Sequence, residues 1–524
     1  MNLHRLVLLA TLSLIAMLSG CGVNPVTGKQ ELQWVSEASE IQTGEQNYAP
    51  TRQGEGGDFS LDPELTAYIN QVGQKLAAVS DRKLPYEFVV LNSSVPNAWA
   101  LPGGKIAVNR GLLPELKNES ELAAVLGHEI VHAAARHGAK AQERGTLMQV
   151  GMVAATVGLA VGNVDGNLAN MAIQGAGVGA QMAQMHYGRD QELESDHYGM
   201  VYMKRAGYDL NGAVTLQQTF VRLSQGQGNQ SWLQGMFASH PPSAERVAKN
   251  EATRAELGGG TGDVGAERFA AKMASLRKMK PAYDKYDQAM AAAGKKDLIA
   301  AKKLAGEAEQ LLPREARFKQ LLGDIALAQK QPAEALVSYQ KAINLDPTYY
   351  APYLGGGIAQ LKVGNKAKAE EWLKKSASLL PTAPAAYYLG SLAKERGDTA
   401  GARQMFQAAA SSQSEYGQMA AGEFQRMDLV TNPGQYIATA VKQDGSGRVF
   451  YAVQNRSQVN VTNLQIVPVQ MDGNGQIVQE GEARLLRIML KPGETTSVDS
   501  GLQAMSVEQA ASLALRVTAA QVAP

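Results

Sequence analysis

Cysteine is almost absent from this chain, which has one, Cys21, in 524 residues. A single thiol excludes a disulfide within the chain and a zinc site built from thiolates. Neither sign of charge is in excess, because 50 lysines and arginines accompany 49 aspartates and glutamates. Without a bulk positive field, nucleic-acid binding has no support in the composition. With 45% hydrophobic and 19% charged residues the chain is globular, and roughly 150 residues per domain predicts about three to four domains.

The N-terminus predicts export and lipid attachment. Residues 1–20 combine Arg5 with an apolar stretch that is too short to span a bilayer, the layout of a secretory signal peptide. The run Leu18-Ser19-Gly20-Cys21 resembles a bacterial lipobox, which implies that Cys21 is lipidated; the alternative is an ordinary signal peptide with an incidental cysteine. Gly22, where sorted lipoproteins of the inner membrane carry aspartate, implies the periplasmic face of the outer membrane in a Gram-negative bacterium. The lipid would be the only membrane attachment.

The histidines indicate metal chemistry. Six of the seven lie between residues 128 and 240, and His128-Glu129-Ile130-Val131-His132 matches H-E-x-x-H. Asn118 as N-cap, Glu121 three residues later and a helical apolar stripe predict a helix over about 119–137. The two imidazoles then lie about 40° apart and one turn along the helix, so both can reach one ion.

These ligands favour one Zn²⁺ per chain, although affinity order alone does not exclude nickel or cobalt. Zinc lowers the pKa of a bound water towards about 7. Glu129 is predicted to take the proton of that water and to pass it to the leaving amine.

The acidic segment 189–196 is predicted to supply the third ligand. Glu192 and Asp196 share one helical face, so Glu192 would complete the site and Asp196 would accept the second N–H of His128. The alternative is a solvated acidic face. His137 lies about 140° around an ideal helix from His132, which predicts a structural or surface role.

The combined pattern resembles the HtpX-like and CAAX-prenyl-type zinc metallopeptidases, specifically their periplasmic lipoprotein branch. The stretches that carry the resemblance, besides H-E-x-x-H and Glu192 to Asp196, are Asn24–Gly28, Asn97–Gly104, and Ser239-His240-Pro241-Pro242 with Arg246. The resemblance covers about residues 24–250 and implies a mainly α, zincin-type (α+β) peptidase domain over 21–257.

His240 and Arg246 are the less defined members of the predicted site. The resemblance implies that His240 approaches the zinc, to stabilise the oxyanion or to occupy the water position at rest; a structural histidine is the alternative. Arg246 would hold either the Glu192–Asp196 segment or a substrate carboxylate.

Pro102-Gly103-Gly104 is a turn signal between two strand-like runs, 98–101 and 105–109, which predicts a β-hairpin. We expect its second strand to be an edge that binds substrate by β-augmentation; the alternative is a structural hairpin. The residues of this expected edge are Lys105, Ile106, Ala107 and Val108.

The remaining chain predicts further domains. After a glycine-rich linker at 258–267, Pro313, Pro347 and Pro381 recur 34 residues apart, the tetratricopeptide period. We expect three to four helical hairpins over 268–425, an α-helical solenoid whose third unit has lost a residue in its first helix. Short strand-like runs between turn signals predict a small β-sandwich over 430–524. The apolar run Leu147–Val161 is shorter than the roughly 20 residues that span a membrane, and a Gly/Ala-rich run continues to Ala183. We expect this stretch, 147–183, to form a pair of small-residue helices near the cleft.

The sequence therefore predicts a multidomain, periplasmic zinc metalloendopeptidase. The resemblance implies unfolded or stalled outer-membrane proteins as substrates, and contacts with the outer-membrane assembly machinery through the repeats. The repeats alternatively serve as a rigid spacer. The rival hypothesis is a tetratricopeptide chaperone or scaffold with a structural or silent metal site, and a weaker one is an exported enzyme that acts on a small amide or the cell wall. Glu129 separates the first two, because a scaffold needs no general base.

Overall fold

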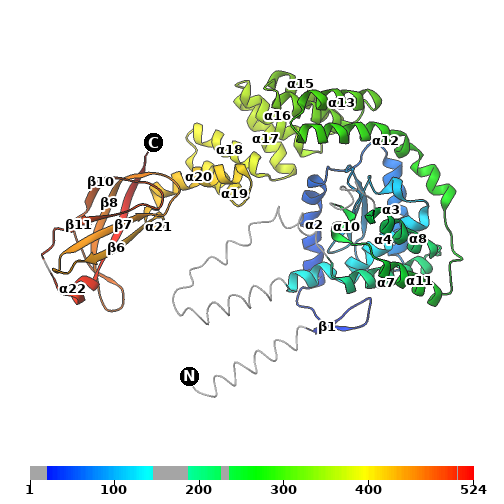
Figure 1. Ribbon diagram of the computed structural model, residues 1–524, viewed down its shortest axis with the longest axis horizontal. Coiled ribbons are helices and arrows are strands. Elements are labelled where there is room, and N and C mark those ends of the chain that lie inside the picture. The colour runs from blue at the N-terminus through cyan, green and yellow to red at the C-terminus, as the bar shows by residue number, and fades with distance from the viewer. Residues whose placement is uncertain (1–20, 145–186, 226–234, 504, 524) are drawn as a thin grey trace, which may run out of the picture. The chain divides into compact units, whose positions relative to one another are not determined.

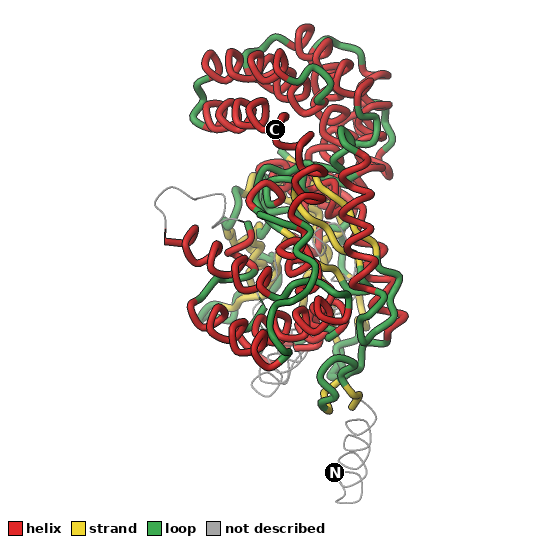
Figure 2. Tube along the Cα trace, turned by 90° about the vertical axis from the view of Figure 1, so that its right-hand side faces the viewer, coloured by secondary structure: helices red, strands yellow, loops and turns green. Residues whose placement is uncertain are grey.

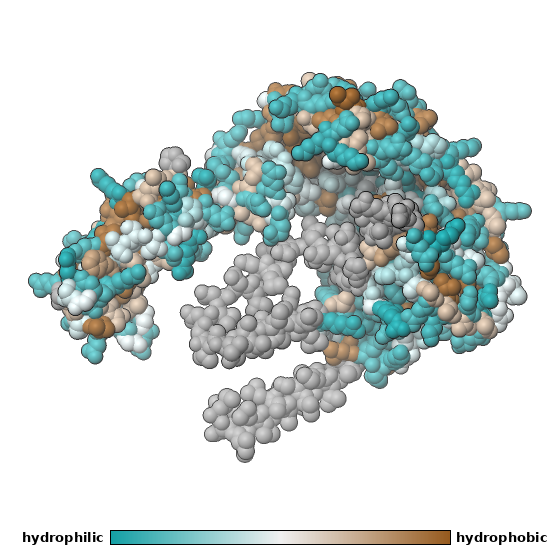
Figure 3. Space-filling model, viewed as in Figure 1, coloured by the Kyte–Doolittle hydropathy of each residue, from teal (hydrophilic) through white to brown (hydrophobic). Residues whose placement is uncertain are grey.

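The structure, a computed structural model, describes residues 21–144, 187–225, 235–503 and 505–523 (Figure 1). The predicted signal peptide and the stretch 147–183 lie outside these residues. Within the described ranges no helix is long and apolar enough to cross a membrane, and the face drawn in Figure 3 is largely hydrophilic. The chain divides into two compact units, Met1–Pro381 and Thr382–Pro524.

The described part of the first unit begins with a short antiparallel hairpin and continues into the predicted peptidase domain. The hairpin consists of β1 (Cys21–Val23) and β2 (Gln30–Leu32), and Figure 2 shows it at the lower tip of the body. The helices that follow it are α2 (Glu37–Gly54), α3 (Pro63–Ala77), the 3₁₀ turn η1 (Leu113–Glu115), α4 (Glu119–Ala134), α7 (Arg189–Arg205), α8 (Asn211–Gln225), α10 (Met236–Ser239) and α11 (Ala244–Glu256).

A three-stranded sheet lies against these helices. Its strands are β3 (Glu87–Leu91), β4 (Ala98–Leu101) and β5 (Lys105–Asn109), in the order β3-β5-β4. The predicted hairpin is confirmed, because β4 and β5 pair antiparallel from Ala98↔Val108 to Leu101↔Lys105. The expectation that Lys105–Val108 is an edge is wrong: β3 pairs in parallel along the whole of β5, which is therefore the central strand.

Helix α4 is buried along its entire length. Asn118 caps it by accepting a hydrogen bond from the Glu121 N–H at 2.9 Å. The Glu121 carboxylate accepts from the Lys117 N–H, so the reciprocal half of the predicted capping box is made one residue earlier than expected. The helix ends at Ala134, and Arg136 then adopts a left-handed φ of 62°, so the predicted helix to residue 137 is interrupted.

Helix α7 crosses α4 at a contact between two glycines. A Cβ atom on Gly127 would lie 3.1 Å from the Gly199 carbonyl oxygen, and one on Gly199 would lie 3.1 Å from the His128 nitrogen. Only residues without side chains fit at this crossing without displacing one helix, so the two backbones meet directly.

The predicted glycine-rich linker lies against the peptidase domain. Asp263 exchanges backbone hydrogen bonds with residues 207 and 209, and the Val264 carbonyl accepts from the Ser120 N–H. The next helix, α12 (Ala266–Gly294), places Phe269 and Met273 in the peptidase core. The first half of α12 therefore belongs to the core of the peptidase domain.

The repeats continue from α12. In the first unit they comprise α13 (Leu298–Leu311), α14 (Ala316–Ala328), α15 (Pro332–Leu345), α16 (Tyr350–Lys362) and α17 (Lys366–Leu379). Successive odd-numbered helices begin 34 residues apart, as the proline spacing predicts. Arg317 connects α14 to the peptidase domain by donating a hydrogen bond to the Gly56 carbonyl at 2.8 Å. Within the repeats, its guanidinium stacks 3.3 Å above the ring of Tyr349, the residue before α16.

The second unit contains one more helical pair and then α20. Its helices are α18 (Ala383–Glu395), α19 (Thr399–Ala410), α20 (Glu415–Thr431), the short α21 (Pro433–Tyr436) and α22 (Val507–Ala511). Helices α16 and α18 both have 13 residues, so the prediction of a residue lost from a first helix is wrong. The missing residue belongs to the connection between helices. Residues 346–349 connect α15 to α16, whereas only residues 380–382, one fewer, connect α17 to α18.

The C-terminal strands form two antiparallel sheets. They are β6 (Ile437–Gln443), β7 (Val449–Asn455), β8 (Val461–Met471), β9 (Ile477–Glu480), β10 (Arg484–Leu490), β11 (Thr495–Asp499) and β12 (Leu513–Val522). One sheet has the order β10-β8-β12, with β9 also on β8, and the other has the order β11-β7-β6. Buried residues of both sheets, such as Tyr451 and Ile466, join one hydrophobic cluster. The antiparallel sheets were predicted; their arrangement as a sandwich stays a prediction.

Two glycines in the repeats give opposite predictions for alanine. A Cβ on Gly356 would overlap the Trp372 ring, whereas one on Gly306 meets open space. We expect Gly356→Ala to destabilise the repeats by about 1–3 kcal/mol through overpacking, and Gly306→Ala to stabilise them by about 0.5–1 kcal/mol. Thermal unfolding followed by circular dichroism measures both. Equal midpoints for the two variants would contradict the contact with Trp372.

Candidate metal centre

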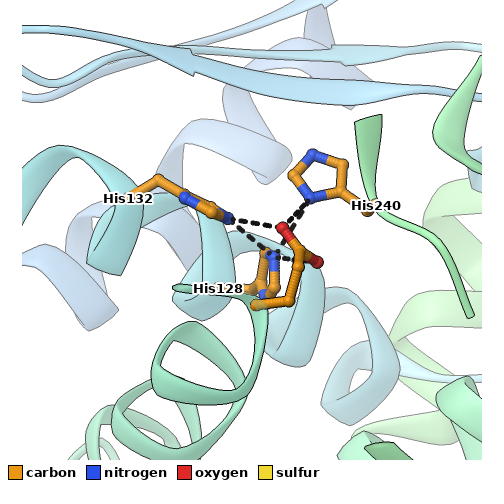
Figure 4. A group of neighbouring side chains, drawn as sticks. His128, His132 and His240 are labelled. Carbon is orange, nitrogen blue, oxygen red and sulfur yellow. Dashed lines mark hydrogen bonds and ion pairs between the residues drawn. The ribbon is translucent and has the colours of Figure 1, made fainter. Parts of the chain in front are cut away.

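Four side chains from three segments converge in the interior of the peptidase domain. His128 and His132 lie on α4, Glu192 lies on α7, and His240 follows α10 (Figure 4). All four are buried, and one donor atom from each lies within 4.8 Å of the others. The structure therefore brings together the three predicted ligands and adds His240 as a fourth.

The spacing of the four donor atoms fits a small tetrahedral cation. His132 Nε2 lies 2.9 Å from His128 Nε2 and 3.4 Å from Glu192 Oε1. His240 Nδ1 lies 3.0 Å from Glu192 Oε1 and 3.3 Å from His128 Nε2. Ligands at zinc–nitrogen or zinc–oxygen distances of about 2.0–2.1 Å in a tetrahedron are about 3.3 Å apart. These four separations are close to that value, and imidazole and carboxylate donors suit zinc.

Glu129 lies next to this donor set without belonging to it. Its side chain is fully buried, and neither carboxylate oxygen has a hydrogen-bond partner among the described residues. The nearest cation-forming group is His240, whose Nε2 is 3.5 Å from Glu129 Oε1 and also lacks a hydrogen-bond partner there. Buried polar atoms are costly unless they are paired. The Glu129 carboxylate oxygens and His240 Nε2 are therefore available to form hydrogen bonds with a group that binds in the site.

Asp196 and Arg246 lie outside the donor set and hold its residues in place. Asp196 Oδ1 lies 2.9 Å from His128 Nδ1, the partner that the sequence pattern predicts. Arg246 donates to both Asp196 oxygens at 2.7 Å and lies 2.8 Å from Glu192 Oε2. Of the two predicted alternatives for Arg246, the structure shows the contact with the acidic segment, and this contact uses its guanidinium.

His137 is a supporting residue that helical geometry failed to indicate. Its Nδ1 lies 2.9 Å from His132 Nδ1, and its Nε2 lies 3.2 Å from Glu194 Oε1. The interruption at Arg136 invalidates the ideal-helix angle and returns His137 to the side of His132. The Tyr187 ring stacks on His132 with centroids 3.8 Å apart. Tyr187 lies two residues before the acidic segment, which is its sequence signal, whereas the pattern around His137 carried none.

The surroundings adjust the charges of the site. Burial raises the pKa of Glu129, with His240 and His128 opposing that shift. Burial also acts on Glu192 and Asp196, but neighbouring cations outweigh it: chiefly His240 for Glu192, whose pKa lies well below its ordinary value, and Arg246 for Asp196, whose pKa is also lowered. Both carboxylates are therefore anionic at neutral pH, the form in which they bind a cation or a ligating imidazole.

The two motif histidines differ in their own pKa. Burial lowers the pKa of His132 well below its ordinary value, so its imidazole is neutral. Burial also disfavours charge on His128, but the Glu192 and Asp196 carboxylates outweigh it and raise the pKa to about 10. A cation that binds His128 must therefore displace a proton.

The predicted substrate strand lies outside this cluster. Lys105 pairs with Glu87 at 2.5 Å on the central strand β5. His197 bonds to the Thr253 hydroxyl at 3.1 Å and takes no part in the donor set.

Comparison with known proteins now identifies the domains. Residues 63–254 match the family model of Peptidase family M48, and residues 326–392 match that of a tetratricopeptide repeat. The match confirms the predicted zinc metallopeptidase class and its zinc cofactor, for which the four buried donors are suited.

Three relatives illustrate the similarity. The beta-barrel assembly-enhancing protease of Escherichia coli K12 is 30% identical over 186 residues, 34% of this chain and 35% of the relative. That of Yersinia pestis is 34% identical over 153 residues, 28% of this chain and 31% of the relative. The mitochondrial metalloendopeptidase OMA1 of Schizosaccharomyces pombe is 32% identical over 232 residues, 43% of this chain and 64% of the relative. The chain thus spans less than two thirds of each.

We expect His137→Asn to weaken zinc binding. The substitution breaks the chain of contacts from His132 through His137 to Glu194, so the ligating ring loses its orientation. Loss of such a supporting contact typically costs about 10- to 100-fold in metal affinity. Competition with a chromophoric chelator measures the change, and His197→Asn is the matched control with unchanged affinity. Equal affinities for the two variants would show that His132 needs no support from His137.

Proposed function

We propose that this chain is a zinc-dependent metalloendopeptidase of the periplasm, held by a lipid on Cys21 at the outer membrane of a Gram-negative bacterium. Its proposed substrates are misfolded or stalled envelope and outer-membrane proteins, which it degrades or assists. The observation that carries the peptidase activity is the buried donor set with the unpartnered Glu129 carboxylate beside it.

The roles of the residues follow from this arrangement. His128, His132 and Glu192 would hold a zinc ion, which supplies a Lewis acid that polarises a carbonyl and lowers the pKa of water. Glu129 would act as general base and then as general acid, because its oxygens have no hydrogen-bond partner among the described residues and burial raises its pKa above the ordinary value.

Arg246 and Asp196 are positioning residues in this proposal. The guanidinium neutralises two buried carboxylates, so that Glu192 is held as an anion beside the ion while Asp196 orients His128. A substrate carboxylate is not needed to explain Arg246, because its contacts within the chain already use the Nε, NH1 and NH2 groups.

Strand β4 replaces β5 as the proposed site of substrate alignment. It ends the sheet order β3-β5-β4 and therefore pairs with one neighbouring strand only within the described residues. Strand β4 packs against α4, the helix that carries His128 and His132. A polypeptide that adds to an edge strand is bound through its backbone, which suits unfolded substrates of varied sequence.

The similarity to beta-barrel assembly-enhancing proteases supports the choice of substrates. The tetratricopeptide repeats support a polypeptide partner, because stacked helical hairpins offer a groove for peptides. We propose that the repeats bring clients, or part of the outer-membrane assembly machinery, to the peptidase domain.

A second candidate function rests on the closed donor set. Four protein donors at tetrahedral spacing are typical of a structural zinc site, whereas a catalytic site keeps one position open. A tetratricopeptide chaperone or scaffold with a silent zinc would have this geometry. It would not require the buried, unpartnered Glu129.

Glu129→Gln distinguishes the two functions. We expect the variant to keep one zinc per chain and to cleave an unfolded outer-membrane protein about 10²- to 10⁴-fold more slowly, because the general base is lost. Zinc content and cleavage are measured in parallel on the mature chain with Cys21→Ser. Glu121→Gln, a buried carboxylate of the same helix outside the site, should retain activity. A wild type without zinc would refute the peptidase, and unchanged cleavage by Glu129→Gln would refute the base.

His240→Ala distinguishes the two predicted roles of His240. If His240 occupies the water position at rest, its removal opens the site, so kcat rises at saturating zinc while zinc affinity falls. If His240 instead stabilises the oxyanion, kcat falls by about 10²- to 10³-fold. We expect the first outcome, because His240 Nδ1 lies within 3.3 Å of two other donors. Cleavage kinetics at a fixed excess of zinc decide between them.

A further inference from the structure

The residue predicted to carry the lipid lies within a β-strand. Cys21 is the first residue of β1 and is the register partner of Leu32 in β2. The turn between the strands is closed by hydrogen bonds from the Asn24 N–H to the Lys29 carbonyl and from the Gly28 N–H to the Asn24 carbonyl. No flexible spacer therefore separates position 21 from folded structure.

The hairpin is fixed to the chain that follows the metal-binding helix. Asn24 Nδ2 donates to the Ala135 carbonyl at 3.4 Å, and Glu31 pairs with Lys140 at 2.7 Å. The buried Glu143 carboxylate accepts from the backbone N–H groups of Trp34 and Val35 at 3.1 and 3.0 Å. These contacts hold the hairpin as one body with the end of α4.

One face of this hairpin exposes large apolar side chains. Val23 is 53% exposed, Leu32 is 38% exposed and Trp34, two residues beyond Leu32, is 45% exposed. Val23 pairs with Gln30, and residues two apart on a strand share a face, so Val23 and Leu32 project from the same side. Figure 3 shows hydrophobic surface at this end of the domain. Glu31, on the other face, makes the contacts to the protein.

We propose that this apolar face of the hairpin, with Val23 and Leu32, and the exposed Trp34 that follows β2 lie in the interfacial layer of the lipid membrane that receives the Cys21 anchor. The inference rests on the proposed lipidation. An acyl chain attached at the first residue of β1 holds the adjacent strand at the headgroup level, where aromatic and aliphatic side chains are stabilised. Because the anchor is next to the apolar face, membrane lipid is the expected partner of that face.

The docked hairpin would orient the metal centre. The lipid would hold the chain at the bilayer, and the apolar face would add interfacial binding that fixes the orientation of the hairpin. Because the hairpin is fixed to residues 135–143, the C-terminal end of α4 would face the membrane. The peptidase would then meet polypeptides in one fixed orientation at the bilayer surface.

Quenching of Trp34 by lipid tests the inference. The lipidated full chain, purified from a Gram-negative host, is placed in vesicles of phosphatidylethanolamine and phosphatidylglycerol that contain brominated acyl chains. The chain has three further tryptophans, so Trp34 is followed through the difference in emission between the wild type and Trp34→Phe, which cancels their contribution. We expect that emission to be quenched by the brominated lipid, and the quenching to be lost when Val23→Asp and Leu32→Asp are combined. Ile299→Asp, an 82% exposed residue of α13, is the matched control without effect.

Three results would overturn the inference, and they are distinguishable. Mass analysis that finds no acyl group on Cys21 refutes the anchor and the docking together, while zinc binding and cleavage are unaffected. An acylated chain whose Trp34 emission is not quenched refutes the docking alone. A soluble Cys21→Ser chain that is dimeric, and becomes monomeric with Leu32→Asp, would assign the apolar face to a second copy of the chain.

Discussion

The contact between Arg246 and two buried carboxylates is the interaction on which the metal centre depends. Arg246 lies on α11, and both of its carboxylate partners, Glu192 and Asp196, lie on α7. Without that cation, two anions one helical turn apart would repel each other in a medium that cannot screen them. With it, Glu192 contributes one of the four donor atoms and Asp196 pairs with Nδ1 of His128.

Local patterns predicted the parts of the site that lie on regular helices. The spacing of His128 and His132 and that of Glu192 and Asp196 depend only on helical geometry, so the sequence places each pair correctly. The tetratricopeptide period likewise results from one repeated local unit. The turn at Pro102–Gly104 indicated the hairpin for the same reason, because its strands are neighbours in the chain.

Non-local pairing and irregular backbone set the limits of sequence reasoning. Whether β5 is central or at an edge depends on β3, a strand from before the hairpin that pairs in parallel. The position of His137 depends on one residue, Arg136, whose left-handed conformation has no clear signature in the sequence. His240 enters the donor set through a short helix distant in sequence from α4. In each case the position depends on a contact between distant segments or on irregular backbone, and a periodic sequence pattern predicts neither.

The glycine contact between α4 and α7 has a consequence for the metal centre as a whole. Because the backbones of the two helices touch at Gly127 and Gly199, main-chain atoms set the separation of the helices that carry three of the four donors. The spacing between the donor atoms of α4 and α7 therefore depends on the backbones of the two helices. Side-chain substitutions elsewhere on these helices can change the charge around the donor atoms while the separation of the two helices stays the same.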